Sequence, residues 1–178
     1  SGYIGSCLML FLKKKFKLIG LDKKEIKFIS IKKCDLKNLK KLNKIVKYIN
    51  PSLTVHLAAQ SLVDETINRK KYFINNVLAT KNLVYALKKN NLDNLVFSST
   101  ASVYKYKNQP LKENSKIYSK SYYAKTKYEC ENIIKKSKLN SIVLRFFNVS
   151  SSLKIKNNIT GEYHNPETHL IPTVVYKN

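Results

Sequence analysis

Tyr123 and Lys127 are the residues of this chain whose types and spacing best suit proton transfer. They stand at positions i and i+4, which share one face of a helix. A phenol with the reference pKa of about 10 is a poor base near neutrality, but a nearby ammonium stabilises the phenolate and lowers that pKa. In a chain with 12 tyrosines the pattern alone is weak. Tyr122 is a weaker candidate, since Thr126 at its i+4 position supplies no cation.

A run of hydroxyl side chains, Ser98, Ser99 and Thr100, follows a strand-like apolar segment. Thr100 can donate a hydrogen bond to the substrate oxygen that Tyr123 protonates and deprotonates. The alternative interpretation is a turn at a strand end, with serines that cap a helix.

The first residues of the chain resemble a phosphate-binding turn. Gly2 and Gly5 have the spacing of the last two glycines of a dinucleotide turn, and the apolar residues 7–12 fit the helix that must follow. In such a turn the backbone approaches the pyrophosphate and the amides of the helix bind it. A GxxG pattern alone is weak evidence. Because the preceding strand would lie before Ser1, we interpret Ser1 as a truncation point.

Asp22 ends the next predicted strand, residues 16–21, roughly 20 residues after the glycines. An acidic residue there binds the adenosine ribose and favours NAD over NADP. A turn aspartate at a strand end is an equally good interpretation.

Short strand-like segments alternate with longer helical patterns along the chain. The continuous apolar runs in the strands predict a parallel sheet that helices cover, which is a Rossmann-like, doubly wound α/β fold truncated at its first strand. Ligands of such sheets bind beyond the carboxyl ends of the strands. His56 lies within an apolar strand and is interpreted as a packed core residue. The predicted strands are 16–21, 26–31, 53–58, 94–98 and 141–147, and the predicted helices are 39–49, 72–87 and 122–136.

The net charge of +23 invites a nucleic-acid interpretation, yet only Arg69 and Arg145 are arginines. Forked guanidinium groups suit phosphate recognition, so we expect no specific nucleic-acid partner and only weak attraction to polyanions. No run of about 18 apolar residues is present, so no membrane association is expected. The three cysteines lack a ligand spacing, which predicts no metal site and indicates reduced thiols in a cytoplasmic protein.

The glycine turn, the hydroxyl run and the Tyr-x-x-x-Lys pair occur together in this order, which is far more specific than any one of them. The chain resembles the extended short-chain dehydrogenases/reductases of the NAD-dependent epimerase/dehydratase family, and within them the UDP-glucose 4-epimerases. Residues 161–172 resemble the sugar-nucleotide loop of the bacterial 4-epimerases. The segments shared with the wider superfamily are 1–6, 55–59, 75–77, 97–104, 123–127 and 144–148.

The resemblance implies interconversion of UDP-galactose and UDP-glucose through a 4-keto sugar, with a tightly held NAD. Tyr123 would exchange the proton of the sugar 4-hydroxyl, Thr100 would hold the 4-oxygen, and Lys127 would bind the nicotinamide ribose. Asn148 and His169 would join Thr100 and Tyr123 in contacting the UDP-sugar. The implied cofactor site comprises Gly2, Tyr3, Ile4, Gly5, Asp22, Asp35, Leu36, Leu57, Ala58, Ala59, Asn76, Ser98, Tyr123, Lys127 and Phe146.

The same resemblance implies a domain division and a partner. Residues 1–150 would form the NAD-binding domain, without its first strand, and residues 151–178 would begin the UDP-sugar-binding domain. Within the latter, residues 150–160 are predicted to be a loop and residues 170–175 to open a helix. The whole protein is expected to be a homodimer, and the chain by itself to be inactive.

Two departures and two alternatives accompany this interpretation. Ser61 stands where a cofactor-contacting lysine is common, and only residues 23–25 separate Asp22 from the next predicted strand. One alternative is a sibling nucleotide-sugar epimerase or a dehydratase. A dehydratase would carry an acidic pair where this chain has Ala101 and Ser102. The alternative of another class is a non-catalytic basic binding module or a decayed fragment.

Overall fold

The computed structural model describes residues 2–24, 31–62, 66, 68–106, 108–150, 152–155, 158–161 and 174. The chain divides into two compact units, Ser1–Lys33 with Asn148–Asn178, and Cys34–Phe147. The larger unit, Cys34–Phe147, carries the tyrosine, the lysine and the hydroxyl run that the sequence singles out.

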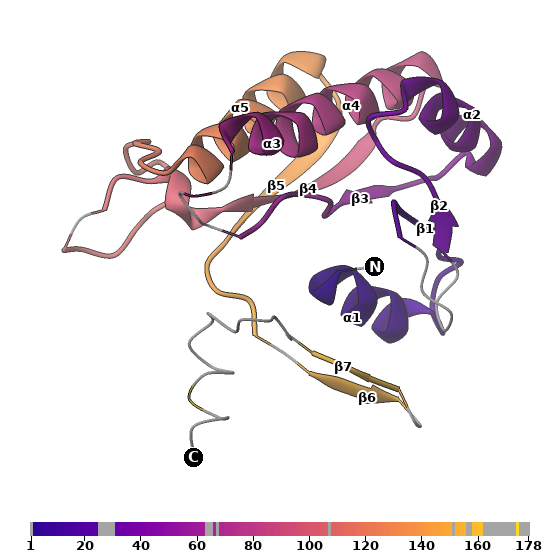
Figure 1. Ribbon diagram of the computed structural model, residues 1–178, viewed down its shortest axis with the longest axis horizontal. Helices are drawn as coiled ribbons and strands as arrows, with labels where there is room; N and C mark the ends of the chain where they lie inside the picture. The colour runs from indigo at the N-terminus through magenta and orange to yellow at the C-terminus, as the bar shows by residue number, and fades with distance from the viewer. Residues whose placement is uncertain are drawn as a thin grey trace. The chain divides into compact units, whose positions relative to one another are not determined.

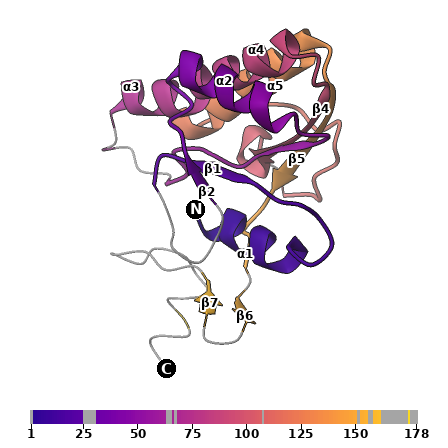
Figure 2. The ribbon, with the colours of Figure 1, turned by 90° about the vertical axis from the view of Figure 1, so that its right-hand side faces the viewer.

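A three-stranded parallel sheet is the centre of the unit Cys34–Phe147. Its strands are β3 (Thr54–His56), β4 (Asn94–Thr100) and β5 (Asn140–Phe146), in the order β3-β4-β5. Helices precede β3 and connect the strands, and all of them lie on one side of the sheet (Figure 1, Figure 2). The parallel α/β architecture that the sequence predicts is therefore confirmed in this unit.

The helices of this unit begin and end where local side chains complete their hydrogen bonds. α2 (Leu39–Ile49) begins where Asn38 accepts a bond from the Lys41 amide, and its bounds match the prediction. α5 (Tyr122–Ser137) begins at Ser121, whose Oγ accepts from the Ala124 amide at 3.1 Å. It ends before Lys138, which adopts the left-handed conformation with φ of 59°.

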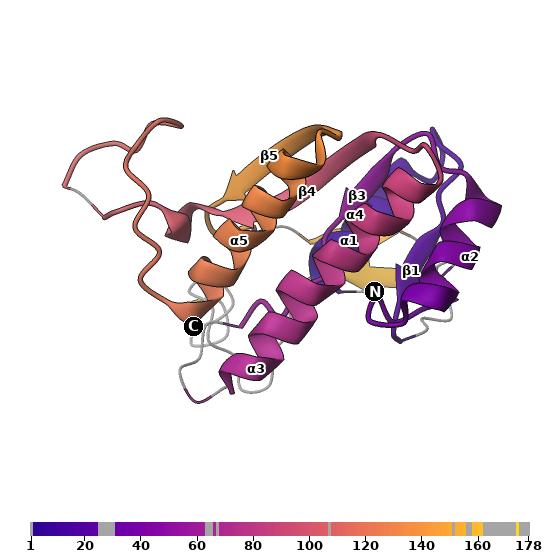
Figure 3. The ribbon, with the colours of Figure 1, turned by 90° about the horizontal axis from the view of Figure 1, so that it is seen from above.

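The helical segment between β3 and β4 contains a wider turn that the sequence does not predict. α3 (Arg69–Tyr72) continues through the π-helical segment Phe73–Leu78 into α4 (Ala79–Lys89), and Figure 3 shows this run beside α5. The predicted helix covered residues 72–87. The π-helical segment carries Asn76, which it holds in a buried position. Such wider turns occur often at functional sites.

The two faces of this sheet differ in burial. Leu95 and Phe97 of β4 face the helices and are buried. Val55 and Ile142 lie on the other face, since both are in register with Val96, and they are 41% and 60% exposed. No helix of the unit Cys34–Phe147 covers that face among the residues described, so the burial of the strands on both faces that the apolar runs predict is not achieved within this unit.

The unit formed by Ser1–Lys33 and Asn148–Asn178 holds short elements. α1 (Tyr3–Leu12) precedes a parallel pair, β1 (Gly20–Asp22) and β2 (Ile31–Lys33). β1 is shorter than its predicted strand, and of predicted strand 26–31 only Ile31 lies among the described residues.

The prediction of a loop over residues 150–160 was wrong in part. β6 (Leu153–Ile155) and β7 (Asn158–Thr160) form an antiparallel pair there. The abundance of lysine and asparagine hides the β-branched Ile155, Ile159 and Thr160, which favour strands. Of residues 170–175, only Val174 is described, and it is helical. Across the described helices, none combines the length and apolar character needed to span a membrane.

Candidate active site

Tyr123 and Lys127 lie at the start of α5, one turn apart on the same face, as their spacing predicts. The Ser121 cap fixes the first turn, and the Thr126 hydroxyl donates to the carbonyl of Tyr123 at 2.8 Å. This geometry places both candidate groups on a rigid element rather than on a loop.

Tyr123 meets Thr100, which ends β4. Burial has the largest influence on the pKa of Tyr123 and raises it. A hydrogen bond with the Thr100 side chain lowers this pKa, and the nearby Tyr72 raises it, so the net shift is upward. The rings of Tyr72 and Tyr123 are 6.5 Å apart. The lowered pKa that the sequence predicts for this phenol is therefore not found, because the loss of hydration outweighs the favourable contact.

Lys127 is buried, with 2% of its surface exposed. Its Nζ lies 4.4 Å from the centre of the Phe97 ring, which is a cation–π contact. Burial lowers the pKa of Lys127 to about 8, against smaller opposing effects of Cys130 and Glu131. The ammonium therefore stays charged near neutrality, and none of the ion pairs among the described residues includes it.

His56 ends β3 and is buried in the core. Its Nε2 is 2.9 Å from Thr80 Oγ1, and its ring centre is 5.4 Å from that of Phe97. Burial and, second, the charge of Lys127 lower the pKa of His56 to about 3. The imidazole is thus neutral near pH 7, and its interpretation as a packed core histidine is confirmed.

Asn76 connects the segment after β3 to α5. Its Oδ1 accepts from the Gln60 amide at 2.7 Å, and its Nδ2 donates to Thr126 Oγ1 at 3.0 Å. These bonds fix the backbone that follows β3 and the turn of α5 that carries Tyr123. Its contact with a cofactor stays a prediction.

Several predicted cofactor residues of this unit lie at or just beyond the carboxyl ends of the sheet strands. Leu57, Ala58 and Ala59 follow β3, and Phe146 ends β5. Because β3, β4 and β5 are parallel, their carboxyl ends share the edge at which Thr100 lies. Ser98 stands in β4 two positions before Thr100, on the same face of that strand by alternation.

Asp35 and Leu36 begin the unit Cys34–Phe147 in a turn. Asp35 Oδ1 accepts from the Lys37 amide at 2.9 Å, and the Leu36 carbonyl accepts from Asn82 Nδ2 at 2.9 Å. The second bond ties this turn to α4.

The predicted residues of the other unit lie at the ends of its elements. Gly2 is the N-cap of α1, and a Cβ added to it would meet nothing within 4 Å. Tyr3, Ile4 and Gly5 form the first turn of that helix. Asp22 ends β1 and accepts from the Lys24 amide at 3.0 Å, which is a strand-end turn.

Two predicted substrate residues remain. Asn148 follows β5 and is exposed. His169, with the rest of the predicted sugar-nucleotide loop beyond Gly161, lies outside the described residues. Within the described ranges, no group of three or more histidine, cysteine, aspartate or glutamate side chains is arranged to hold a metal ion.

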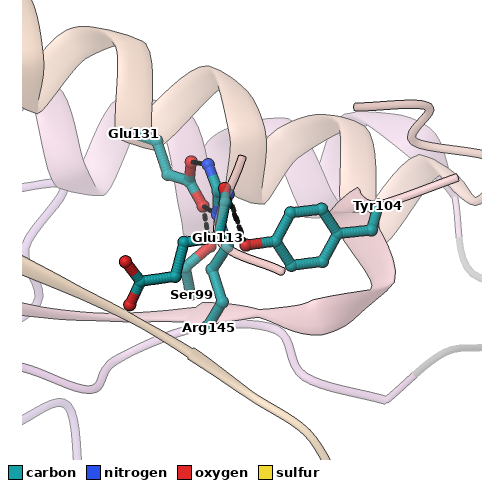
Figure 4. Close-up of polar contacts among 5 residues, drawn as sticks. All are labelled: Ser99, Tyr104, Glu113, Glu131 and Arg145. Carbon is teal, nitrogen blue, oxygen red and sulfur yellow. Dashed lines mark hydrogen bonds and ion pairs between the residues drawn. The ribbon is translucent and has the colours of Figure 1, made fainter. Parts of the chain in front are cut away.

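The sequence did not predict a polar network that includes Ser99, the residue before Thr100 (Figure 4). The carboxylate of Glu131 binds Arg145 and Ser99, and Arg145 also reaches Tyr104. The signal was available in part, since Glu131 stands at i+4 from Lys127 on the same helix face and Arg145 is one of only two arginines.

Comparisons with a family model and with known proteins agree on one family. The model of the NAD dependent epimerase/dehydratase family matches residues 1–177. A UDP-glucose 4-epimerase of Rhizobium meliloti (strain 1021) is 31% identical over 98% of this chain and 57% of its own length. One of Mycoplasma genitalium (strain ATCC 33530 / DSM 19775 / NCTC 10195 / G37) is 33% identical over 98% of the chain and 56% of its length. The chain therefore spans little more than half the length of these relatives.

Solved structures show the same likeness. A UDP-glucose 4-epimerase from Brucella ovis in complex with NAD superposes with a TM-score of 0.87 at 27% identity, covering 97% of this chain and 56% of the other. The UDP-Glc/GlcNAc 4-epimerase of Campylobacter jejuni superposes with a TM-score of 0.76 at 26% identity, covering 84% of this chain and 51% of the other.

Proposed function

The chain belongs to the NAD dependent epimerase/dehydratase family, and on this premise we propose that it is the nucleotide-binding part of a UDP-glucose 4-epimerase. The reaction is the NAD-dependent interconversion of UDP-galactose and UDP-glucose through a 4-keto sugar. The observation that carries the proposal is the half-buried Tyr123, hydrogen-bonded with Thr100 and followed one turn later by a buried, charged Lys127. UDP-glucose 4-epimerases among the relatives support the choice of substrate.

The residues present fit NAD. Lys127 carries a buried charge that has no ion pair among the described residues, and the ribose hydroxyls of a dinucleotide would supply oxygen acceptors for it. Gly2 leaves open space at the N-terminus of α1, where backbone amides can bind a pyrophosphate. When bound, NAD would take a hydride from carbon 4 of the sugar and return it to the other face.

Each proposed catalytic residue has one task. Tyr123 removes the proton of the sugar 4-hydroxyl and later returns it to the 4-oxygen. Thr100 holds that oxygen by a hydrogen bond, which fixes it opposite the phenol. Lys127 holds the nicotinamide ribose, and its charge opposes the upward shift that burial gives the pKa of Tyr123. We propose that the remaining predicted cofactor residues contact NAD and that Asn148 and His169 contact the UDP-sugar.

The proposal extends to the arrangement of the whole protein. We place the NAD-binding domain at residues 1–150 and the start of the UDP-sugar-binding domain at residues 151–178. The complete protein is proposed to be a cytoplasmic homodimer. Light scattering on the complete reading frame would contradict the dimer if it gave the mass of a single chain.

Turnover by the longest reading frame that contains this chain tests the proposal. UDP-galactose is supplied without added NAD, and UDP-glucose is followed beside the Tyr123→Phe variant. We expect turnover by the unsubstituted protein and a loss of roughly 10²–10⁴-fold in the variant. A folded protein that carries NAD yet leaves UDP-galactose unchanged would favour a sibling nucleotide-sugar enzyme. A folded protein with neither NAD nor turnover would favour the binding module or the decayed fragment.

A further inference from the structure

We infer that Glu131 is a positioning residue whose carboxylate, held by Arg145, fixes the end of β4 that carries Thr100 against the helix that carries Tyr123. The inference rests on the proposed function, because the positioned groups are the ones assigned to proton transfer. Figure 4 shows Glu131 reaching from α5 toward Ser99 and Arg145.

The Glu131 carboxylate joins three elements. Its Oε1 accepts from the Ser99 hydroxyl of β4 and from Arg145 Nε of β5, the latter at 3.0 Å. Its Oε2 accepts from Arg145 Nη2 at 2.6 Å. Glu131 itself is only 7% exposed. The paired, forked geometry restrains orientation as well as distance, which a single contact would not do.

The guanidinium of Arg145 extends the connection to the segment that follows β4. Its Nη1 donates to the Tyr104 hydroxyl at 2.8 Å and to the Glu113 carbonyl at 3.4 Å. The Tyr104 hydroxyl donates in turn to the Glu113 carbonyl at 3.2 Å. Ser99 and Arg145 are also partners in the register of β4 and β5. Arg145 therefore restrains the backbone on both sides of Thr100.

The position of Thr100 depends on this connection. It directly follows Ser99, and its Oγ1 accepts from the Ser102 amide at 3.2 Å. On the other side, Glu131 lies two turns along α5 from Tyr123. A shift of α5 against β4 would thus change the separation of Thr100 and Tyr123, and catalysis is sensitive to displacements of about 1 Å.

A purely stabilising ion pair is the competing explanation, and the two can be separated. Replacing both members of a buried ion pair by apolar residues is often neutral for stability, whereas removing one leaves a charge unpaired. The double variant Glu131→Met/Arg145→Met should therefore fold. If the pair only stabilises, the double variant keeps its activity. If the pair positions Thr100, the double variant folds but is less active than the unsubstituted protein.

The decisive experiment measures kcat, KM and the pH profile of the double variant in the complete reading frame. We expect kcat to fall by about tenfold or more and KM to change by less than about threefold. The pH midpoint assigned to Tyr123 should move upward, since the hydrogen bond with Thr100 lowers its pKa. The exposed pair of Lys88 and Asp93 gives the matched control, Lys88→Gln/Asp93→Asn, which should leave all three quantities unchanged. Unchanged kcat and pH profile in the folded double variant would overturn the inference.

Ser99→Ala provides a second variant that leaves the ion pair intact, in case the double variant does not fold. It removes the link from β4 to Glu131, and we expect a smaller loss of kcat with the same upward shift of the pH midpoint. Wild-type values in Ser99→Ala would also overturn the inference. Absence of turnover in the unsubstituted protein would instead defeat the proposed function. The positioning role is then decided by the pKa of Tyr123 in carbon-13 NMR, which should rise in Ser99→Ala and stay unchanged if the inference is wrong.

Discussion

Lys127 and Arg145 are two cations near the same stretch of α5, and their environments are opposite. Lys127 has the ring of Phe97 as its neighbour at 4.4 Å, and burial lowers its pKa to about 8. Arg145 is forked onto the carboxylate of Glu131, whose hydrogen bonds raise the pKa of Arg145 above its ordinary value. One charge is buried without an ion pair among the described residues, and the other is fully matched.

The difference distinguishes a cation that takes part in the proposed chemistry from a cation that fixes the surrounding elements. A buried cation with no matching anion is costly for the folded state, and such groups are typical of functional sites. A matched cation fixes neighbouring elements instead. α5 supplies the unpaired cation, Lys127, and one turn later Glu131, the carboxylate that pairs with Arg145 of β5. Four substitutions or titrations test this contrast.

Lys127→Met should have the largest effect, and it should act on catalysis. The methionine keeps much of the aliphatic volume but removes the cation that we propose holds the ribose and opposes the upward pKa shift of Tyr123, so we expect turnover to fall by roughly 10²-fold or more. Thermal stability should stay the same or rise, because a buried unpaired charge is lost. The UDP-galactose assay and a melting curve measure the two effects. Full activity, or a clear drop in melting temperature, would break the contrast.

Arg145→Met should have the opposite profile, with its main effect on stability. It leaves the Glu131 carboxylate buried without its partner, which destabilises by about 3 kcal/mol or more. Urea unfolding of the variant measures this loss, provided that the slope of the transition is unchanged. The double variant Glu131→Met/Arg145→Met is the control and should regain most of the stability. Equal loss in the single and double variants would show that the unpaired Glu131 carboxylate is not what destabilises Arg145→Met.

The pH dependence of stability sharpens the contrast without a substitution at the anchor. Between pH 8 and 10.5 the folded protein has lost the Lys127 proton while the unfolded chain still holds it. Stability contributed by this group therefore rises with pH across that window, by at most about 3 kcal/mol, and the penalty is fully present below pH 8. Unfolding free energies of the wild type and Lys127→Met, compared at each pH, isolate the effect from the other lysines. Parallel curves for the two proteins would contradict the lowered pKa.

Lys88→Gln should have the smallest effect. Lys88 Nζ lies 3.8 Å from Asp93 Oδ1 and both side chains are about half exposed, at 49% and 59%. Solvent screens such a pair, so its removal should change the free energy of unfolding by less than about 1 kcal/mol. The same urea titration measures it, and a loss as large as that of Arg145→Met would show that burial does not distinguish these ion pairs.

Local patterns predicted most elements of the unit Cys34–Phe147. The amphipathic period of α2 predicted its bounds, and the predicted end of α5 was one residue short of the observed end at Ser137. The π-helical segment Phe73–Leu78 was not predicted, since its extra residue per turn leaves no clear mark on an apolar pattern. The β6-β7 pair was missed because composition outweighed the alternation of a short strand.

The sequence by itself determined that Tyr123 and Lys127 share a helix face, because the backbone geometry of an α-helix fixes the spacing of positions four apart. It also predicted, from the apolar run before them, that the hydroxyl side chains up to Thr100 follow a strand; the structure extends that strand through Thr100. Only the tertiary structure decided the charge properties of these groups. The upward pKa of Tyr123, the downward pKa of Lys127 and the pairing of Glu131 with Arg145 all depend on burial and on contacts between distant segments. Desolvation and pairing arise only when the chain has folded, so no spacing along the sequence encodes them directly.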